Sequence, residues 1–330
     1  MRAIAITLVA LVFPASAFAD PSTVRSSGYG DLSVSVSGAE PHSIVVSYGA
    51  GGYEVTDSAG IAVSDPEFST CASTGPDTAR CADRPPNPEL GLGEVSVFVE
   101  GGMGNDTITF ASIAPAAHSV VHAFAGNDRI VGSDKDDLVY GYKGDDTLIG
   151  NGGDDSLFGG PGGQDTGADT FDGGPGADYV NGESSEGGYS VDTVSYAEST
   201  GPVKVTPGFG DGDDGGAADG PPGQRDTVEY VENVVGGGGN DVIVAVGRTE
   251  ATDHLDNVFF GGAGADRLLG GGGPDRLIGG PGADSLLGQG SKDALLAHDG
   301  ARDKRIDCGP GTGKKERASR DRVDPVAISC

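Results

Sequence analysis

The chain has 330 residues, a formal net charge of −29 and 60 glycines, but no tryptophan and only 6% aromatic residues. Glycine loses more backbone entropy on folding than other residues do, so this composition argues against two ordinary globular domains, which the length alone would allow. The acidic charge excludes electrostatic binding of nucleic acid and of anionic membranes, and it makes cations the natural partner.

The first residues have the features of a secretory signal peptide. Arg2 precedes an apolar run over residues 4–13, and Ala17-Phe18-Ala19 is a small-x-small pattern before Asp20. The run is too short to span a bilayer. We expect cleavage after Ala19 and a secreted, extracellular protein without membrane insertion; the alternative is a buried N-terminal strand.

Residues 20–100 contain short segments in which polar and apolar residues alternate. The clearest are 32–36, 43–48, 53–55 and 95–99, which turn residues separate. This pattern is typical of β-strands. We expect a β-rich cap over the first open coil of the repeats that follow, because terminal units of stacked folds are commonly atypical. A separate ligand-binding β-domain is the alternative.

The four cysteines suit an oxidising destination. Four cysteines allow three connectivities, of which local pairing, Cys71 with Cys81 and Cys308 with Cys330, is the simplest. Zinc is a poor alternative, because the spacing is wrong and no histidine lies close by in sequence.

A nine-residue pattern, G-G-x-G-x-D-x-U-x with U apolar, recurs in two blocks, residues 101–195 and 236–296. Residues 150–158 read GNGGDDSLF, and residues 261–269 read GGAGADRLL. The aspartates keep a strict phase of nine residues over 128–155 and again over 266–293. We therefore expect a repeat architecture rather than a globular core.

Each position of the pattern has a physical task. The first six residues reverse the chain, and glycine reaches the positive φ angles that this requires. The last three form a short strand whose U residue faces inward. Two repeats make one turn of a flattened helix, so the pattern predicts an all-β parallel β-roll with strands about 4.8 Å apart. The predicted inward residues are Ile108, Ile130, Val139, Leu148, Leu157, Val180, Leu268, Leu277, Leu286 and Leu295.

The turn aspartates are predicted to stack in columns, as with Asp128 over Asp146 and Asp266 over Asp284, which are 18 residues apart. A core one side chain thick gains little from burial, and unneutralised carboxylate columns repel. Carboxylates and glycine carbonyls together offer only oxygen ligands. Calcium accepts six to eight oxygens in flexible geometry, whereas magnesium needs a strict octahedron. We therefore expect several Ca²⁺ ions to be bound.

These repeats resemble the RTX, or hemolysin-type calcium-binding, nonapeptides of exported bacterial proteins. The resemblance implies a β-roll that folds on binding calcium after secretion, with the sixth-position aspartate as side-chain ligand. That role would fall to Asp106, Asp128, Asp137, Asp146, Asp155, Asp178, Asp266, Asp275, Asp284 and Asp293. Carbonyl ligands would come from glycines such as Gly141, Gly144, Gly261 and Gly264.

Several positions depart from the family pattern. Residues 123–131 lack the opening glycine pair, Asn257 replaces the aspartate, and five-residue insertions follow Asp155 and Asp178. Calcium sites beside these positions are expected to be less complete. The family's toxins and proteases usually carry an uncleaved C-terminal secretion signal, so their export route is not inferred for this chain.

Two segments lie outside the repeats. Residues 196–235 are expected to form an irregular acidic insertion; an EF-hand is disfavoured there, because Pro222 stands where its glutamate is needed. Residues 297–330 are basic and resemble the disulfide-closed C-terminal cap of some exported repeat proteins. This tail is expected to lie against the acidic roll or to touch a polyanionic cell-surface polymer.

No catalytic motif is present. His118 and His122 are four residues apart but lack the glutamate of a zinc protease, and no G-x-S-x-G elbow or phosphate-binding loop occurs. The sequence therefore predicts a protein that is not an enzyme. We expect a secreted or cell-surface calcium-binding protein with a structural, adhesive or matrix role. The alternatives are a secreted hydrolase or lyase acting on extracellular polymer, and a calcium buffer.

Overall fold

The computed structural model describes residues 22–26, 32–36, 38–49, 52–63, 71–82, 95–113, 117–160, 167–182, 190–207, 213–221, 225–245, 256–309 and 317–325. The expected signal peptide, residues 1–19, lies outside these ranges. Regular structure within them consists of β-strands. In this part of the chain no helix is long and apolar enough to cross a membrane.

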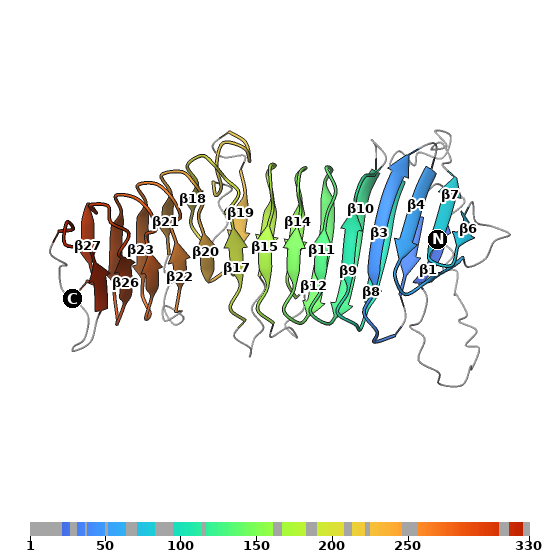
Figure 1. Cartoon of the computed structure of the whole chain (residues 1–330), viewed down its shortest axis with the longest axis horizontal. Helices are drawn as coiled ribbons and strands as arrows, with labels where there is room; N and C mark the ends of the chain where they lie inside the picture. Colours follow the sequence, from blue (N-terminus) through green and yellow to red (C-terminus); the bar gives the residue numbers. More distant parts are fainter. Residues whose placement is uncertain are drawn as a thin grey trace, which may run out of the picture.

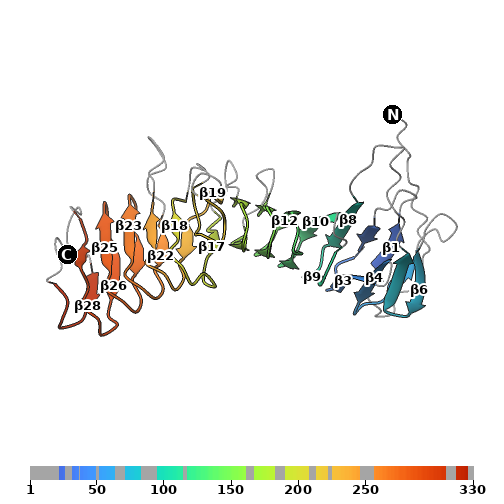
Figure 2. The same ribbon diagram turned by 90° about the horizontal axis from the view of Figure 1, so that it is seen from above.

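The strands lie one behind another along a single axis, with the N-terminal strands at one end and the C-terminal strands at the other (Figure 1). Seen from above, they form two layers, with β8, β10 and β12 on one side and β3 and β9 on the other (Figure 2). One layer is a 14-stranded sheet, which we call the long sheet. The other is divided into a nine-stranded and a five-stranded sheet.

The long sheet contains, in spatial order, β28 (Arg317–Arg320), β26 (Ala294–Ala297), β24 (Arg276–Ile278), β22 (Val258–Phe260), β20 (Asn233–Val235), β17 (Thr193–Ser195), β15 (Thr170–Asp172), β13 (Thr147–Ile149), β11 (Arg129–Val131), β9 (Thr107–Phe110), β3 (Ser43–Gly49), β4 (Gly52–Asp57), β7 (Thr78–Ala82) and β6 (Cys71–Gly75). The nine-stranded sheet contains β19 (Thr227–Glu229), β16 (Tyr179–Asn181), β14 (Ser156–Phe158), β12 (Asp137–Lys143), β10 (Ala117–Ala125), β8 (Val95–Gly102), β2 (Leu32–Ser35), β1 (Ser22–Ser26) and β5 (Ile61–Val63). The five-stranded sheet contains β18 (Lys204–Val205), β21 (Val242–Val244), β23 (Arg267–Gly271), β25 (Ser285–Gln289) and β27 (Arg305–Asp307).

Pairing within the repeats is parallel and in the expected register. Ile130 of β11 lies opposite Leu148 of β13, and Leu268 of β23 lies opposite Leu286 of β25, so partners are one predicted coil apart. The all-β fold with long parallel sheets is therefore confirmed, and it is consistent with a β-roll.

The core is a single layer of inward side chains between the two sheet layers. All ten residues predicted to face inward are at most 1% exposed. Phe171 and Phe259 fill the same layer and are fully buried. Successive side chains of a strand point to opposite faces, so only the middle residue of a three-residue strand faces the core. One apolar residue per repeat is therefore sufficient to fill the core.

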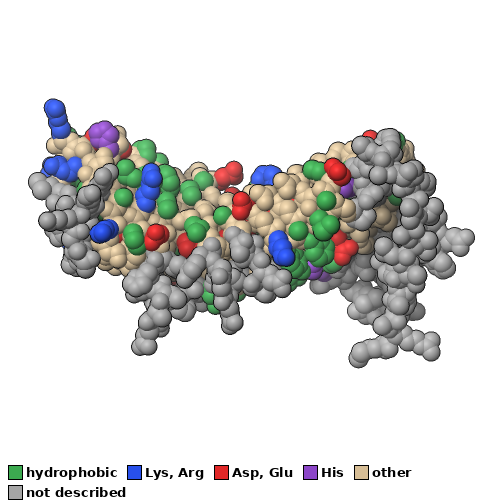
Figure 3. All heavy atoms as spheres, turned by 90° about the horizontal axis from the view of Figure 1, so that it is seen from below, with side chains coloured by type: hydrophobic (Ala, Val, Ile, Leu, Met, Phe, Trp, Pro, Cys, Tyr) green, Lys and Arg blue, Asp and Glu red, His purple; other side chains and the backbone are tan. Residues whose placement is uncertain are grey.

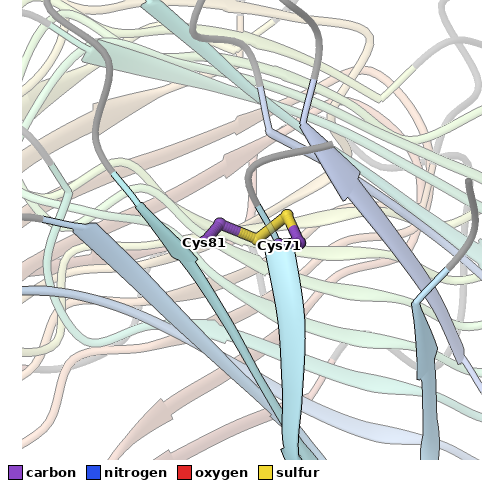
Figure 4. Close-up of a disulfide and its surroundings, with 2 residues drawn as sticks. All are labelled: Cys71 and Cys81. Carbon is purple, nitrogen blue, oxygen red and sulfur yellow. A yellow bond between two sulfur atoms is a disulfide. The ribbon is translucent and has the colours of Figure 1, made fainter. Parts of the chain in front are cut away.

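The N-terminal region extends both layers of the roll. β2 pairs in parallel with β8, and β3 pairs in parallel with β9, whereas β4, β7 and β6 continue the long sheet by antiparallel pairing. The Cys71–Cys81 disulfide joins the neighbouring strands β6 and β7, as predicted (Figure 4). This covalent link therefore lies in the N-terminal region and not in the C-terminal tail.

Residues 196–235, for which an irregular insertion was expected, contain strands β18, β19 and β20. The long sheet passes through this region without interruption, because β20 pairs with both β17 and β22. The opposite layer changes sheets here: the nine-stranded sheet ends at β19 and the five-stranded sheet begins at β18.

The last coil is formed by β27 and β28, which pair with β25 and β26. Cys308, directly after β27, is fully buried and disulfide-bonded. Its predicted partner, Cys330, lies outside the described residues.

Candidate metal centre

The aspartates that close the nine-residue turns are buried at the start of the short strands. The ten predicted as ligands are at most 3% exposed, although each carries a carboxylate. Asp146, for example, directly precedes β13, and Asp155 directly precedes β14. Buried carboxylates are rare unless hydrogen bonds or cations compensate them.

Hydrogen bonds from backbone to carboxylate join the aspartates of successive coils. The Asp128 N–H donates to Asp146 Oδ1 at 2.7 Å, across 18 residues. The Asp266 N–H likewise donates to Asp284 Oδ1 at 2.9 Å. The predicted stacking of these pairs is confirmed, and a hydrogen bond between coils partly offsets the repulsion expected for such columns.

Three columns of this kind run along the roll, one beside each sheet. The column of the long sheet contains His42, Asp106, Asp128, Asp146, Asp169, Asp192, Glu232, Asn257, Asp275 and Asp293. Between Glu232 and Asn257 the bond differs in kind, because the Asn257 side-chain amide donates to the Glu232 backbone carbonyl at 2.8 Å. The column of the nine-stranded sheet contains Ser119, Asp137, Asp155, Asp178 and Asp226. The column of the five-stranded sheet contains Val203, Asp241, Asp266, Asp284, Asp303 and Asp324.

Several column members were not among the predicted ligands. Asp169 follows the first five-residue insertion, yet it accepts the Asp146 N–H at 2.8 Å, so the insertion leaves the column intact. Asp241 belongs to residues 236–244, GGGGNDVIV, a complete copy of the pattern that could have identified it. Asp303 could not be found by phase, because an additional residue separates it from the inward Ile306.

The second carboxylate oxygen, Oδ2, is buried without a hydrogen-bond partner in many column aspartates of the described chain. These aspartates include Asp106, Asp128, Asp155, Asp178, Asp266, Asp275, Asp284 and Asp303. A buried acceptor without a donor is costly, and more so when it is charged. A row of such oxygens along one edge of a sheet is the arrangement that a bound cation would satisfy.

The first glycine of each repeat leaves room at these oxygens. A Cβ atom on Gly150 would collide with Asp155 Oδ2 and would lie 2.5 Å from the Gly173 carbonyl oxygen of the next coil. Of the glycines predicted as carbonyl ligands, Gly141 faces Asp146 Oδ2 and Gly261 faces Asp266 Oδ2 in the same way.

Gly144 and Gly264, also predicted as carbonyl ligands, lie elsewhere in the turn. A Cβ on either would collide with the glycine carbonyl of the preceding coil, and both take positive φ angles, 120° and 147°. Only glycine tolerates both the conformation and the close approach. The turns therefore stack backbone on backbone beside the carboxylates.

Burial raises the pKa of several column aspartates above the ordinary value of 3.8. It raises the pKa of Asp128 to about 7 and that of Asp155 to about 8, against the lowering effect of the backbone N–H that each accepts. The pKa of Asp275 is likewise raised to about 8 and that of Asp284 to about 7, with burial as the main cause. Without a cation, the columns therefore hold protons near neutral pH.

The N-terminal end of the long-sheet column is closed by a histidine. The His42 N–H donates to Asp106 Oδ1 at 2.8 Å, so His42 takes the place that an aspartate has in later coils. Its Nδ1 lies 2.7 Å from Asp57 Oδ2, and both side chains are fully buried. The repeating carboxylate column thus ends at a His–Asp pair of the cap.

The donor set of the columns fits calcium. Within the described ranges, no group of three or more His, Cys, Asp or Glu side chains could jointly hold a metal ion. An ion at the columns would therefore need backbone carbonyl oxygens in addition to the Oδ2 atoms. Carbonyl and carboxylate oxygens are the ligands that Ca²⁺ prefers. The first-position glycines bring carbonyl and carboxylate oxygens together in successive coils. Each column therefore offers oxygen ligands for several ions.

Comparison with known protein families agrees with this geometry. Residues 122–157, 136–163, 165–185, 228–245 and 269–301 match the model of the RTX calcium-binding nonapeptide repeat (4 copies). No curated protein matches the chain. Asp128, Asp155 and Asp284 lie within the matched segments, whereas Asp106 and Asp266 lie outside them.

Proposed function

Because the chain carries RTX calcium-binding nonapeptide repeats across residues 122–301, we propose that it is a secreted or cell-surface protein whose β-roll folds on binding several Ca²⁺ ions. The role proposed for the folded roll is structural, adhesive or in an extracellular matrix. The row of buried Oδ2 atoms without hydrogen-bond partners is the observation that carries the calcium part of this proposal.

The proposed ligands are the column aspartates together with the carbonyls of first-position glycines. Calcium would supply positive charge between coils. The chain itself supplies the rest: Oδ1 accepts the N–H of the preceding coil, Oδ2 faces the glycine carbonyl of the next, and glycine leaves the space between them. The negative charge of the columns would be neutralised either by bound Ca²⁺ or by protons. Folding would therefore be coupled to the binding of calcium or of protons.

An extracellular setting supports this coupling. Extracellular calcium modules bind with dissociation constants of about 10⁻⁴–10⁻³ M, which leaves them empty inside cells and filled outside. The Cys71–Cys81 disulfide and the repeats both suit an exported protein. Cleavage after Ala19 is part of the proposal and is tested by N-terminal sequencing of the secreted chain.

Circular dichroism of the chain from Asp20 onward tests calcium-driven folding. We expect little β-structure in chelator and a cooperative gain of β-structure as calcium reaches the millimolar range, with magnesium much less effective. A β-rich spectrum that is identical in chelator and in calcium would contradict the proposal.

The proposal is of a protein without enzymatic activity. The rival, a hydrolase or lyase that uses the roll as a stabilising module, predicts that cell-wall or extracellular polysaccharides are degraded. Incubation of the calcium-loaded chain with such polymers, followed by analysis of released reducing ends, separates the two. Release at a rate above that of the heat-treated chain would favour the enzyme.

A further inference from the structure

The outward surface of the nine-stranded sheet carries a concentration of aromatic rings. Strand register places His122 beside Tyr140, and Tyr140 beside Phe158, in three successive coils. Phe124 and Tyr142 form a second pair alongside, and Phe98 and Tyr179 lie at the two ends. We call these seven residues the aromatic face. Hydrophobic side chains also gather in one patch beside a histidine in the surface view (Figure 3).

The rings follow one another at regular intervals along the axis of the roll. Ring centroids are 5.2 Å apart for Phe98–His122, 5.0 Å for His122–Tyr140, 4.9 Å for Tyr140–Phe158 and 5.6 Å for Phe158–Tyr179. Rings stacked squarely would approach to about 3.5 Å. Tyr140 and Phe158 are stacked with an angle of 17° between their planes, whereas the other three pairs are tilted by 43°, 49° and 54°.

Coil stacking does not require these rings. In the five-stranded sheet, which has the same parallel pairing, the positions equivalent to His122, Tyr140 and Phe158 are Leu269, Leu287 and Asp307. The aromatic face is therefore a local property of β8 to β16. Ring-to-ring contact also stabilises adjacent strands, so the test below measures stability and binding separately.

Two of the rings are held in a strained backbone conformation. Phe124 and Tyr142 have φ angles of 76° and 75°, at the second position of the repeat, where the pattern has glycine. Asn151 and Gln289 have the same conformation at this position of other repeats, with φ angles of 75° and 74°, so the positive φ belongs to the turn and not to the aromatic face alone. Phe124 is 37% exposed, so the strain does not serve to bury it.

The carboxylates at the two ends of the central row disfavour an anionic ligand, although the exposed Lys143 follows Tyr142 at the edge of the aromatic face. In the register of the central row, Glu100 precedes His122, and Asn181 and then Glu229 follow Phe158. Burial lowers the pKa of His122, against the raising effect of the Glu100 carboxylate. The chain as a whole has a net charge of −29. A ligand with phosphate, sulfate or carboxylate groups would be repelled at both ends of the row.

Hydroxyl and amide groups at the rim suit a ligand rich in hydroxyls. The Tyr142 hydroxyl lies 2.9 Å from His122 Nδ1, and the Tyr179 hydroxyl donates to Glu229 Oε2 at 2.7 Å. Asn181 Nδ2 donates to the Tyr179 hydroxyl at 2.9 Å. Rings with polar atoms at their edges bind a partner that is apolar on one face and polar around its rim. Sugar rings have this character.

We propose that the aromatic face binds a neutral polysaccharide, which lies along the axis of the roll with its sugar rings against the row His122, Tyr140 and Phe158. A linear ligand whose units repeat at an interval close to the coil spacing meets an equivalent ring in each coil. The inference goes beyond calcium binding and rests on the proposed function only in requiring a folded roll.

Isothermal titration of the chain from Asp20 onward, in calcium and shown by circular dichroism to be β-rich, tests the proposal. The probes are hexasaccharides of β-1,4-glucan, of chitin and of mannan, with an alginate oligomer and phosphatidylglycerol vesicles as the anionic arms. We expect binding of at least one neutral hexasaccharide and of neither anionic probe.

Variants locate the site. Tyr140→Ala should weaken binding about tenfold, and Tyr140→Phe should retain it, because the ring rather than the hydroxyl provides the contact. Phe260→Ala is the matched control: Phe260 is 42% exposed on β22 of the long sheet, and its removal should change affinity less than twofold.

Several outcomes would overturn the inference: no binding of any neutral hexasaccharide by the β-rich chain, equal affinity in Tyr140→Ala, or binding of vesicles instead. Calcium titration of each variant is run in parallel. A chain that folds with calcium but ignores sugars refutes only the inference, whereas a β-rich chain indifferent to calcium refutes only the proposed folding mechanism.

Discussion

At the scale of the residue, the column aspartate has two separate roles for its two oxygens. Oδ1 of Asp155 accepts the Asp137 N–H at 2.7 Å, whereas Oδ2 is buried without a hydrogen-bond partner. Asparagine would keep the first interaction and lose the charge of the second. The two roles can therefore be separated by a single substitution.

We expect Asp155→Asn to weaken calcium binding at its site by about tenfold or more, which is ~1.4 kcal/mol. In chelator, the variant should contain at least as much β-structure as the parent, because burial already raises the pKa of this carboxyl to about 8 and a neutral amide costs less to bury. Calcium titration calorimetry measures the first effect, and circular dichroism in chelator measures the second.

Asp134→Asn is the matched control for that substitution. Asp134 lies in the coil that precedes Asp155, is 78% exposed and forms a surface ion pair with Lys135 at 3.3 Å. Such pairs contribute little to stability. Loss of calcium affinity in both variants alike would show that net charge, and not the column, governs binding.

At the scale of the element, the turn is organised around a glycine that has no room for a side chain. A Cβ on Gly150 would collide with Asp155 Oδ2 and lie 2.5 Å from the Gly173 carbonyl oxygen. Both neighbours belong to the stacked turns and have little freedom to move. The first-position glycine is thus required by the column rather than by its own backbone angles.

We expect Gly150→Ala to lower both the thermal midpoint and calcium affinity, with a destabilisation of about 1–3 kcal/mol, as for other overpacked sites. Gly49→Ala provides the comparison, since a Cβ at that strand end meets nothing within 4 Å. Denaturant unfolding of the two variants in calcium measures the difference in their free energies of unfolding. Equal stability of the two variants would disprove the steric argument.

The Cys71–Cys81 disulfide belongs to the N-terminal region and not to the aspartate columns. Cys71 and Cys81 are ten residues apart, and a loop of this size contributes about 3 kcal/mol in the chain-entropy model. The double variant Cys71→Ser/Cys81→Ser should therefore lower the thermal midpoint. It should leave calcium stoichiometry unchanged, because the column aspartates lie from residue 106 onward; a lost ion would show that the cap contributes to a site.

At the scale of the whole molecule, the columns link folding to pH. In the calcium-free fold the pKa values of Asp128, Asp155 and Asp275 are raised to about 7, 8 and 8, whereas unfolded aspartates titrate near 3.8. Between these values the folded state holds more protons than the unfolded state. Stability of the calcium-free fold is therefore greatest in acid and is lost as pH rises through about 7 to 8.

We expect the chelated chain to contain more β-structure at pH 5, where the column carboxyls are protonated, than at pH 8.5, where they are charged. In millimolar calcium the order should reverse, because ion binding requires deprotonated carboxylates and tightens as pH rises. Thermal scans by circular dichroism at both pH values, with and without calcium, measure this. Calcium-free stability that increases with pH would contradict the burial of these carboxylates.

The C-terminal half of the roll is coupled to the N-terminal half through the long sheet. The expected break over residues 196–235 affects only one layer, because β17, β20 and β22 remain paired in sequence. The other layer changes from the nine-stranded to the five-stranded sheet at this point. One continuous sheet thus spans both repeat blocks.

Much of the site could be predicted, because its information is local. The nine-residue period determines which side chain faces inward and which glycines lie in the turn. It also determines which aspartates, 18 residues apart, lie next to each other in successive coils. Leu148, Asp146 and Gly141 follow from position in the pattern alone. Asp169 and Asp303 do not, since an insertion or an additional residue shifts their phase while hydrogen bonding between coils retains them in the column.

What the sequence alone determined is therefore the coil: its inward residues, its turns and its stacked aspartates, all set by the short-range stereochemistry of nine residues. Only the tertiary structure decided how coils meet. The pairing of strands from different coils places His122, Tyr140 and Phe158 in one row and divides one layer into two sheets. It also places His42 at the end of a carboxylate column. These contacts depend on pairing between distant strands, which no local periodicity specifies.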